Sequence, residues 1–157
     1  ARAAGESATY PIDYSTYVNP EYRRAPHLEI ISRELEAFEA GIVRGVPQRL
    51  IIEAPPQHSK SQTCSIHFPE WLIGKHPDWP LILTSATADL AETFSTAIRD
   101  RIRDDSKYHA LFPNIRLSPD TAAKAKWKLS GRSRPTLRAL GIGGAIPLQF
   151  TRSDCGN

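Results

Sequence analysis

Residues 51 to 63, IIEAPPQHSKSQT, run from an apolar stretch through two prolines into a Lys-Ser pair. The phosphate-binding loop pattern is G-x-x-x-x-G-K-[ST], and it lies between a strand and a helix. Lys60 and Ser61 match its last two positions, whereas Ala54 and Ser59 stand where the two glycines belong. The stretch therefore predicts either a nucleotide site that has replaced its glycines, or an ordinary helix start capped by Ser59.

Phosphate binding by such a loop has defined chemical requirements. Backbone N–H groups must turn inward at the positive end of a helix. An ammonium group must reach the outer phosphates, and a hydroxyl must bind Mg²⁺. Lys60 and Ser61 supply these last two groups. Pro55 and Pro56 donate no N–H, so the turn has to come from other residues.

The elements around the loop indicate an α/β fold with a mainly parallel sheet and flanking helices. An apolar strand is expected at 49–54, and a helix runs from 60 to about 71, bent or ended near Pro69. A second strand at 81–86 precedes a helix at 88–103 with Leu90, Phe94 and Ile98 on one face. In such a sheet the loop lies at the carboxyl end of the first strand, where ligands bind.

The two ends of the chain give weaker patterns. Residues 1–25 lack apolar periodicity and are expected to form a loosely held arm with four tyrosines for docking. A helix should follow, with Pro26 in its first turn and Gly41 as its stop. Segments 126–130 and 136–142 flank a turn at Gly131 and predict a hairpin or two adjacent strands.

Composition fits one soluble domain. The 157 residues are 40% hydrophobic and 24% charged, and no apolar run approaches the ~20 residues of a membrane span. Without a signal-peptide pattern, we expect a cytoplasmic protein that makes no membrane contact. Cys64 and Cys155 suggest no disulfide framework.

Charge is unevenly distributed along the chain. Residues 116–157 hold eight Lys and Arg against two Asp, whereas residues 1–115 carry a net charge of −3. The basic end is compatible with contact to a polyanion, or with an ordinary solvated surface. Trp127 between Lys126 and Lys128 is expected in the core, with base stacking as the alternative. Cys64 and His67 are expected to be a packed cysteine and a surface histidine, not zinc ligands.

The ordered series of motifs from about residue 20 to residue 146 resembles the ATPase domain of tailed-phage terminase large subunits, the DNA-packaging motors. That family often has a strand ending in Pro-Pro, then x-His-Gly-Lys-Ser, Phe-Pro-x-Trp, and a second strand leading into S-x-x-x-x-L-A. "LFPNIRLSPD" (111–120) and "LGIGGAI" (140–146) also resemble the family. The main matching positions are Pro55, Pro56, His58, Lys60, Ser61, Phe68, Pro69, Trp71, Gly74, Pro77, Ser85, Asp89, Leu90, Ala91 and Phe94.

This resemblance implies a P-loop NTPase fold that binds ATP and Mg²⁺. Lys60 is then expected to hold the β- and γ-phosphates, and Ser61 the metal ion. The backbone of residues 57 to 61, including His58, is expected to cradle phosphate, and Gln57 stands where relatives often carry Arg or Gln. Ser59 in place of glycine departs from the family, because a Cβ there resists the backbone conformation required.

In a complete relative, the domain powers packaging of double-stranded DNA into procapsids, together with a small terminase subunit and a portal. The family's acidic pair should follow "GIGGAI", but here the chain continues as "PLQFTRSDCGN". We therefore expect an N-terminal arm at 1–25, a partial ATPase domain at 26–146 and a divergent tail at 147–157, with the sheet incomplete and no catalytic carboxylate. The alternative is a non-catalytic prophage remnant in the bacterial cytoplasm, so enzymatic activity stays open.

Overall fold

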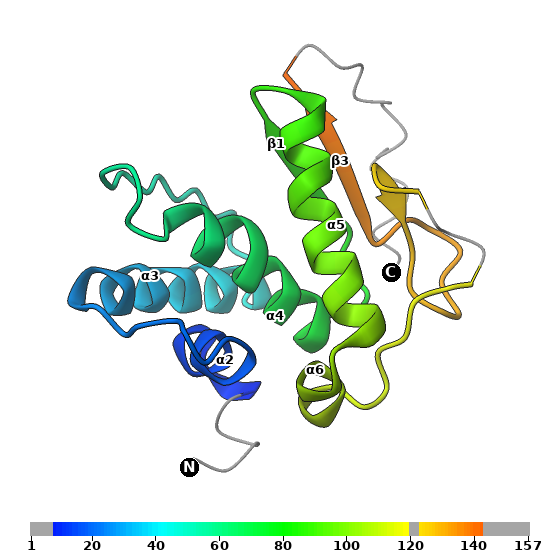
Figure 1. The fold of residues 1–157 in the computed structure, drawn as a ribbon, viewed down its shortest axis with the longest axis horizontal. Coiled ribbons are helices and arrows are strands. Elements are labelled where there is room, and N and C mark those ends of the chain that lie inside the picture. The colour runs from blue at the N-terminus through cyan, green and yellow to red at the C-terminus, as the bar shows by residue number, and fades with distance from the viewer. Residues whose placement is uncertain (1–7, 120–122, 143–157) are drawn as a thin grey trace.

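The computed structural model describes residues 8–119 and 123–142, which form a mixed α/β fold (Figure 1). No helix in these ranges is long and apolar enough to cross a membrane. The elements, in chain order, are α2 (Pro11–Val18), α3 (Pro26–Val43), the π-helical η1 (Gln62–His67), α4 (Phe68–Lys75), β1 (Leu81–Ser85), α5 (Ala88–Asp104), α6 (Ser106–Leu111), β2 (Lys126–Trp127) and β3 (Leu137–Gly141).

The sheet has the strand order β1-β3-β2. β1 and β3 are parallel, with Leu81 opposite Leu137, and α5 forms the crossover between them and packs against both. β2 is antiparallel to β3, and Gly131, at φ 77°, lies in the connection between them. The predicted hairpin is therefore confirmed and the strand predicted at 81–86 is present, but the sheet is small and mixed.

The predicted strand at 49–54 is wrong. This segment is extended but belongs to no strand. The side chains of Leu50 and Ile52 pack against the core, whereas Ile51 is 86% exposed. None of the described strands pairs with it, although β1 lies at the edge of the sheet. In Figure 1 the loop after it therefore lies apart from the carboxyl ends of β1 and β3.

Residues 8 to 25 are not a loosely held arm. They contain α2, whose Tyr14 is fully buried, and Trp71 on α4 donates its indole N–H to the Ala8 carbonyl. Tyr22 is buried as well. The sequence shows no helical period here because α2 is buried on most of its circumference, so polar Asp13 and Ser15 lie inside as well.

Helix α3 begins at Pro26 as expected but passes through Gly41 and ends at Val43. Gly45 at φ 74° terminates it, with its N–H donating to Ile42 and the N–H of Val46 donating to Gly41. This pair of hydrogen bonds is the Schellman motif, which favours glycine at the left-handed position.

The helix that follows the loop begins at Lys60 and continues to Lys75, beyond the predicted end near 71. The expected disturbance near Pro69 is a π-helical stretch just before it, where the N–H of Phe68 donates to the Thr63 carbonyl. A wider turn relieves the clash between the Pro69 ring and the preceding helical carbonyls.

The buried face of α5 is only partly the predicted one. Ile98 and Ile102 are fully buried, but Leu90 is 44% exposed and Phe94 is half-buried. Ala91 and Ser95 face inward instead. Small residues let α5 approach the sheet closely, and Ser95 accepts a hydrogen bond from the Trp127 indole at 2.9 Å.

A buried carboxylate joins four helices. Glu70 on α4 is 0% exposed and accepts hydrogen bonds from Tyr14 of α2 at 2.9 Å and from Arg101 of α5 at 3.0 Å. Its backbone carbonyl accepts the hydroxyl of Tyr108 on α6. Burial raises the pKa of Glu70 to about 7, against the opposing pull of Arg101 and the Tyr14 hydroxyl.

His67 is buried near Arg101, and its effect on the stability of the fold changes with pH in the opposite direction to that of Glu70. Burial lowers the pKa of His67 to about 4, from an ordinary value of 6.5, and the Arg101 charge adds to this. Protons bind the folded state less readily at His67, so its contribution to stability grows as pH rises from about 4 to 6.5. Glu70 binds its proton more readily when folded, so its contribution falls between pH 4.5 and about 7.

The Glu70→Gln variant should therefore gain stability with rising pH more steeply than the native chain. Only the His67 contribution remains when the Glu70 carboxyl is gone, and the two no longer offset each other. The free energy of unfolding from urea titrations at several values between pH 4 and 6.5 measures both slopes. Asp104→Asn, on the exposed end of α5, is the matched control. Identical slopes for Glu70→Gln and the native chain would contradict the assignment.

Candidate functional site

The loop from residue 54 to residue 61 makes a tight turn with two residues in the left-handed region. Gln57 has φ 62° and Ser59 has φ 55°. Neither is glycine, and each unfavourable backbone position costs on the order of 1 kcal/mol. The sequence expectation that Ser59 is a point of strain is confirmed in its backbone, and Gln57 is a second such point that the sequence did not reveal.

Backbone N–H groups collect at this turn. Those of Gln57, His58 and Ser59 donate to no acceptor elsewhere in residues 8–119 and 123–142. The next three, from Lys60 onward, are the first N–H groups of the helix and have no intrahelical acceptor. Together they form a row of free donors at the positive end of a helix, which is the chemistry that binds anions.

Lys60 and Ser61 take different positions at the helix start. The Lys60 ammonium bends back across the turn and donates to the Ala54 carbonyl at 3.2 Å. Ser61 is helical and exposed. The Ser59 hydroxyl makes no hydrogen bond to a described residue, so the capping alternative for Ser59 finds no support. The Lys60 ammonium and the exposed Ser61 side chain thus both lie at the helix start that carries the free N–H groups.

Hydrogen bonds from Thr63, which is itself bonded to Tyr22, hold the backbone of Ser59 in place. Its carbonyl accepts both the backbone N–H and the hydroxyl of Thr63, each at 2.9 Å. The Thr63 hydroxyl in turn lies 2.7 Å from the hydroxyl of Tyr22, which precedes α3. Because Thr63 is already a donor to Ser59, Tyr22 donates to Thr63. Sequence analysis missed both residues, since only the fold brings Tyr22 to the loop.

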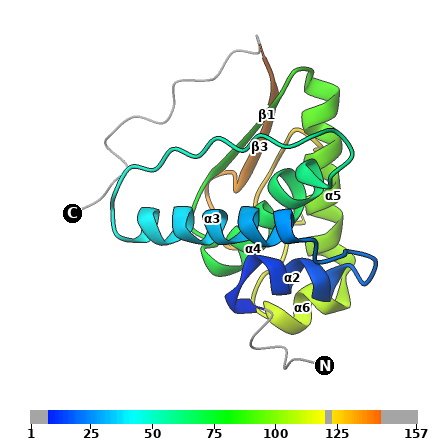
Figure 2. The ribbon, with the colours of Figure 1, turned by 90° about the vertical axis from the view of Figure 1, so that its left-hand side faces the viewer.

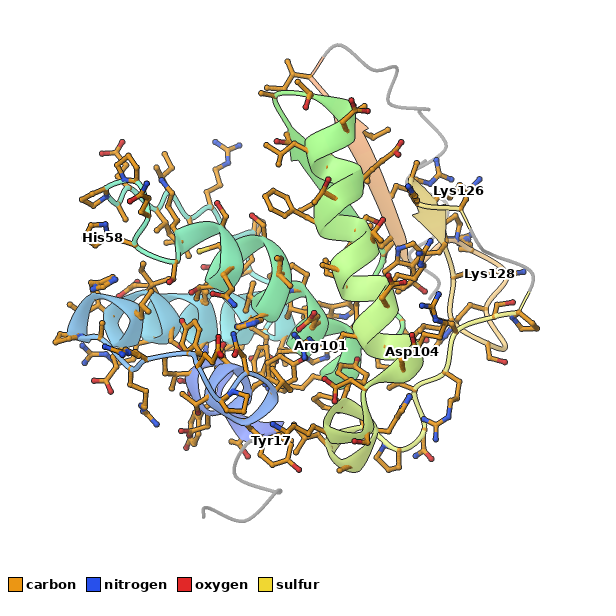
Figure 3. The ribbon with its side chains drawn as sticks, in the orientation of Figure 1. Tyr17, His58, Arg101, Asp104, Lys126 and Lys128 are labelled. Carbon is orange, nitrogen blue, oxygen red and sulfur yellow. The ribbon has the colours of Figure 1, made fainter. Side chains whose placement is uncertain are left out.

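A cavity of about 270 Å³ opens beside the turn. The His27 and His58 rings, which both line it, contact each other edge-on with 5.5 Å between centroids, and His58 donates from Nδ1 to the Pro56 carbonyl. His27 Nε2 is buried without a described partner. Figure 3 shows His58 at the tip of the loop, away from the sheet. The lining residues are Glu21, Tyr22, Arg23, Ala25, His27, Leu28, Gln57, His58, Ser59 and Gln62.

The other candidate residues lie elsewhere. Trp127 is fully buried, so the base-stacking alternative is wrong and the core position is confirmed. Lys126 and Lys128 lie on the hairpin, far from His58 (Figure 3). His67 is buried between Tyr14 and Tyr22, so the expected surface histidine is wrong, and Cys64 is half-buried. Within the described ranges, no three His, Cys, Asp or Glu residues could hold a metal ion together.

Comparison with protein-family models, curated proteins and solved structures finds no match to this chain. The geometry of the loop and the sequence resemblance are therefore the basis for assigning a function.

The Ser59→Gly variant should be more stable than the native chain. Glycine adopts the left-handed conformation without the Cβ penalty, and the expected gain is about 0.5–1 kcal/mol after its greater entropy loss on folding. Urea denaturation measures the free energy of unfolding.

Ser61→Gly is the matched control, because Ser61 has φ −64° in the helix that follows. Glycine at that position should lower stability by about 0.5 kcal/mol. Destabilisation of both variants would show that Ser59 is not strained.

Proposed function

We propose that this chain binds a nucleoside triphosphate, with ATP and Mg²⁺ as the expected ligands, at the loop of residues 57 to 61. The observation that carries the proposal is the row of unbonded backbone N–H groups at the start of the helix, next to the Lys60 ammonium. Six adjacent N–H donors can bind the oxygen atoms of a polyphosphate, and the Lys60 ammonium attracts its negative charge.

Lys60 is the group that changes partner on binding. Its present acceptor, the Ala54 carbonyl, is neutral and belongs to the same loop. A phosphate oxygen is a stronger acceptor because the hydrogen bond joins two opposite charges. Lys60 then reaches the β- and γ-phosphates while the turn keeps its shape.

The metal and the rest of the nucleotide have room at the same site. The exposed Ser61 hydroxyl follows Lys60 directly and can bind Mg²⁺, which neutralises phosphate charge when bound. The cavity, which is lined in part by Tyr22, His27 and His58, can hold the base and ribose. The residues therefore fit a bound nucleotide with its metal.

Hydrolysis needs a carboxylate that orients water and completes the metal shell. Of the carboxylates near the loop, Glu21 lines the cavity and Glu53 precedes the prolines, and no three His, Cys, Asp or Glu residues in the described ranges could hold a metal ion together. We propose binding with little or no turnover. On the resemblance, the biological role is packaging of double-stranded DNA as part of a terminase large subunit, with a small subunit and a portal as partners.

Calorimetric titration with Mg·ATP tests the site. Lys60→Ala should weaken binding about tenfold or more, because a charge-assisted contact worth about 1.5–3 kcal/mol is lost. Ser59→Gly should tighten binding about fivefold, since glycine forms the turn without strain. Lys126→Ala, an exposed lysine on β2, is the matched control and should leave the affinity unchanged.

The alternative, a remnant that binds nucleotide weakly or not at all, predicts a different outcome. If neither Lys60→Ala nor Ser59→Gly changes the affinity for Mg·ATP, the loop is not a working phosphate site and the remnant interpretation holds. Equal losses for Lys60→Ala and Lys126→Ala would indicate only general attraction between a basic protein and an anion.

A further inference from the structure

Residues 49–54 form an extended connection (Figure 2) that has no strand partner in the described ranges. It belongs to no strand, and the N–H and C=O groups of residues 49 to 53 bond to no other described residue. Figure 2 shows this segment crossing in front of β1 and β3, between the end of α3 and the start of η1. An extended backbone with unpaired donors and acceptors is a template for pairing with another chain.

Side chains alternate along this segment as they do on a half-buried strand. Leu50 and Ile52 pack against the core. Arg49, Ile51 and Glu53 are exposed, and Ile51 has 86% of its surface in solvent. One face is therefore anchored to the molecule and the other points outward, which fixes the conformation that a partner strand would meet.

The segment lacks the devices that prevent strand pairing. Residues 49–54 contain no proline and no lysine, and the nearest prolines, Pro47 and Pro55, lie outside the segment. Proline cannot donate to a ladder, so these two residues limit any pairing to about seven residues between them. The exposed face carries one charge of each sign, on Arg49 and Glu53, with an isoleucine between them.

This order of residues is complementary to itself. In an antiparallel pair with a two-fold axis at Ile51, Arg49 lies opposite Glu53 of the second copy, and Glu53 lies opposite its Arg49. The two isoleucines meet at the axis, and Leu50 lies opposite Ile52 on the inner face. Opposite charges and apolar pairs placed directly across two strands stabilise antiparallel pairing.

We propose that two copies of this chain associate through antiparallel pairing of residues 49–54, centred on Ile51. The two-fold symmetry makes both ion pairs form at once, as in an isologous dimer. Neither Arg49 nor Glu53 makes an ion pair with another described residue, so both are available. The paired segment ends at Ala54, before residues 57 to 61.

Charge reversal tests whether a second copy of the chain pairs with residues 49–54. Sedimentation of the native chain from about 1 µM to about 1 mM should show a monomer–dimer equilibrium, because a short two-stranded interface is weak. Arg49→Glu should weaken dimerisation about tenfold or more, since both ion pairs become repulsive. The double variant Arg49→Glu with Glu53→Arg restores opposite charges across the axis and should recover it. Equal far-UV circular dichroism confirms that the variants fold.

Cross-linking tests the register. In a background of Cys64→Ser and Cys155→Ser, Ile51→Cys should form a disulfide dimer on mild oxidation, because only the residue at the axis faces its own copy. Glu53→Cys is the matched control and should cross-link far less. A monomer throughout the concentration range overturns the proposal. A dimer that ignores the charge reversal and cross-links equally at both positions also overturns it, and places the interface elsewhere.

Discussion

The Glu70 carboxylate is the contact on which the arrangement of helices depends. It is excluded from solvent and held by Tyr14 and Arg101, while the carbonyl of the same residue accepts the Tyr108 hydroxyl. Removing either partner leaves a buried carboxyl group short of a hydrogen bond, at a cost of about 1–3 kcal/mol. One residue thus holds α2, α5 and α6 around α4. The hydrogen bonds from Tyr14 and Arg101 offset the free-energy cost of removing the Glu70 carboxyl from water.

That arrangement positions the loop. The helix that carries Glu70 is continuous back to Lys60, so holding α4 also orients the free N–H groups at its start. The docking of α2 brings Tyr22 to Thr63, and Thr63 holds the carbonyl of Ser59. The left-handed conformation of Ser59 is therefore imposed by contacts from three parts of the chain, which is how strained turns persist in folded proteins.

Sequence patterns predicted the elements whose periodicity is local and missed those decided by tertiary contacts. β1, α5 and the hairpin have simple apolar patterns, and all three are present. Segment 49–54 has the composition of a buried strand, but no described strand pairs with it. The sequence did not predict helix α2, because most of its circumference is buried and it shows no amphipathic pattern. The predicted end of α3 at Gly41 was wrong, because Gly45 and not Gly41 adopts the positive φ that ends the helix. At the site, the motif predicted Lys60 and Ser61 as site residues, whereas the roles of Tyr22 and Thr63 depend on tertiary contacts that the sequence does not show.

The central claim is that the backbone of residues 57 to 61 binds phosphate. Amide ¹H–¹⁵N spectra of the full chain during titration with Mg·ATP test it most directly, because they report on each N–H group separately. The account predicts that the largest shifts fall on Gln57, His58, Ser59, Lys60 and Ser61, and that inorganic triphosphate reproduces them. Shifts confined to the basic hairpin around Lys126, or no shifts at the loop near saturation, would contradict it.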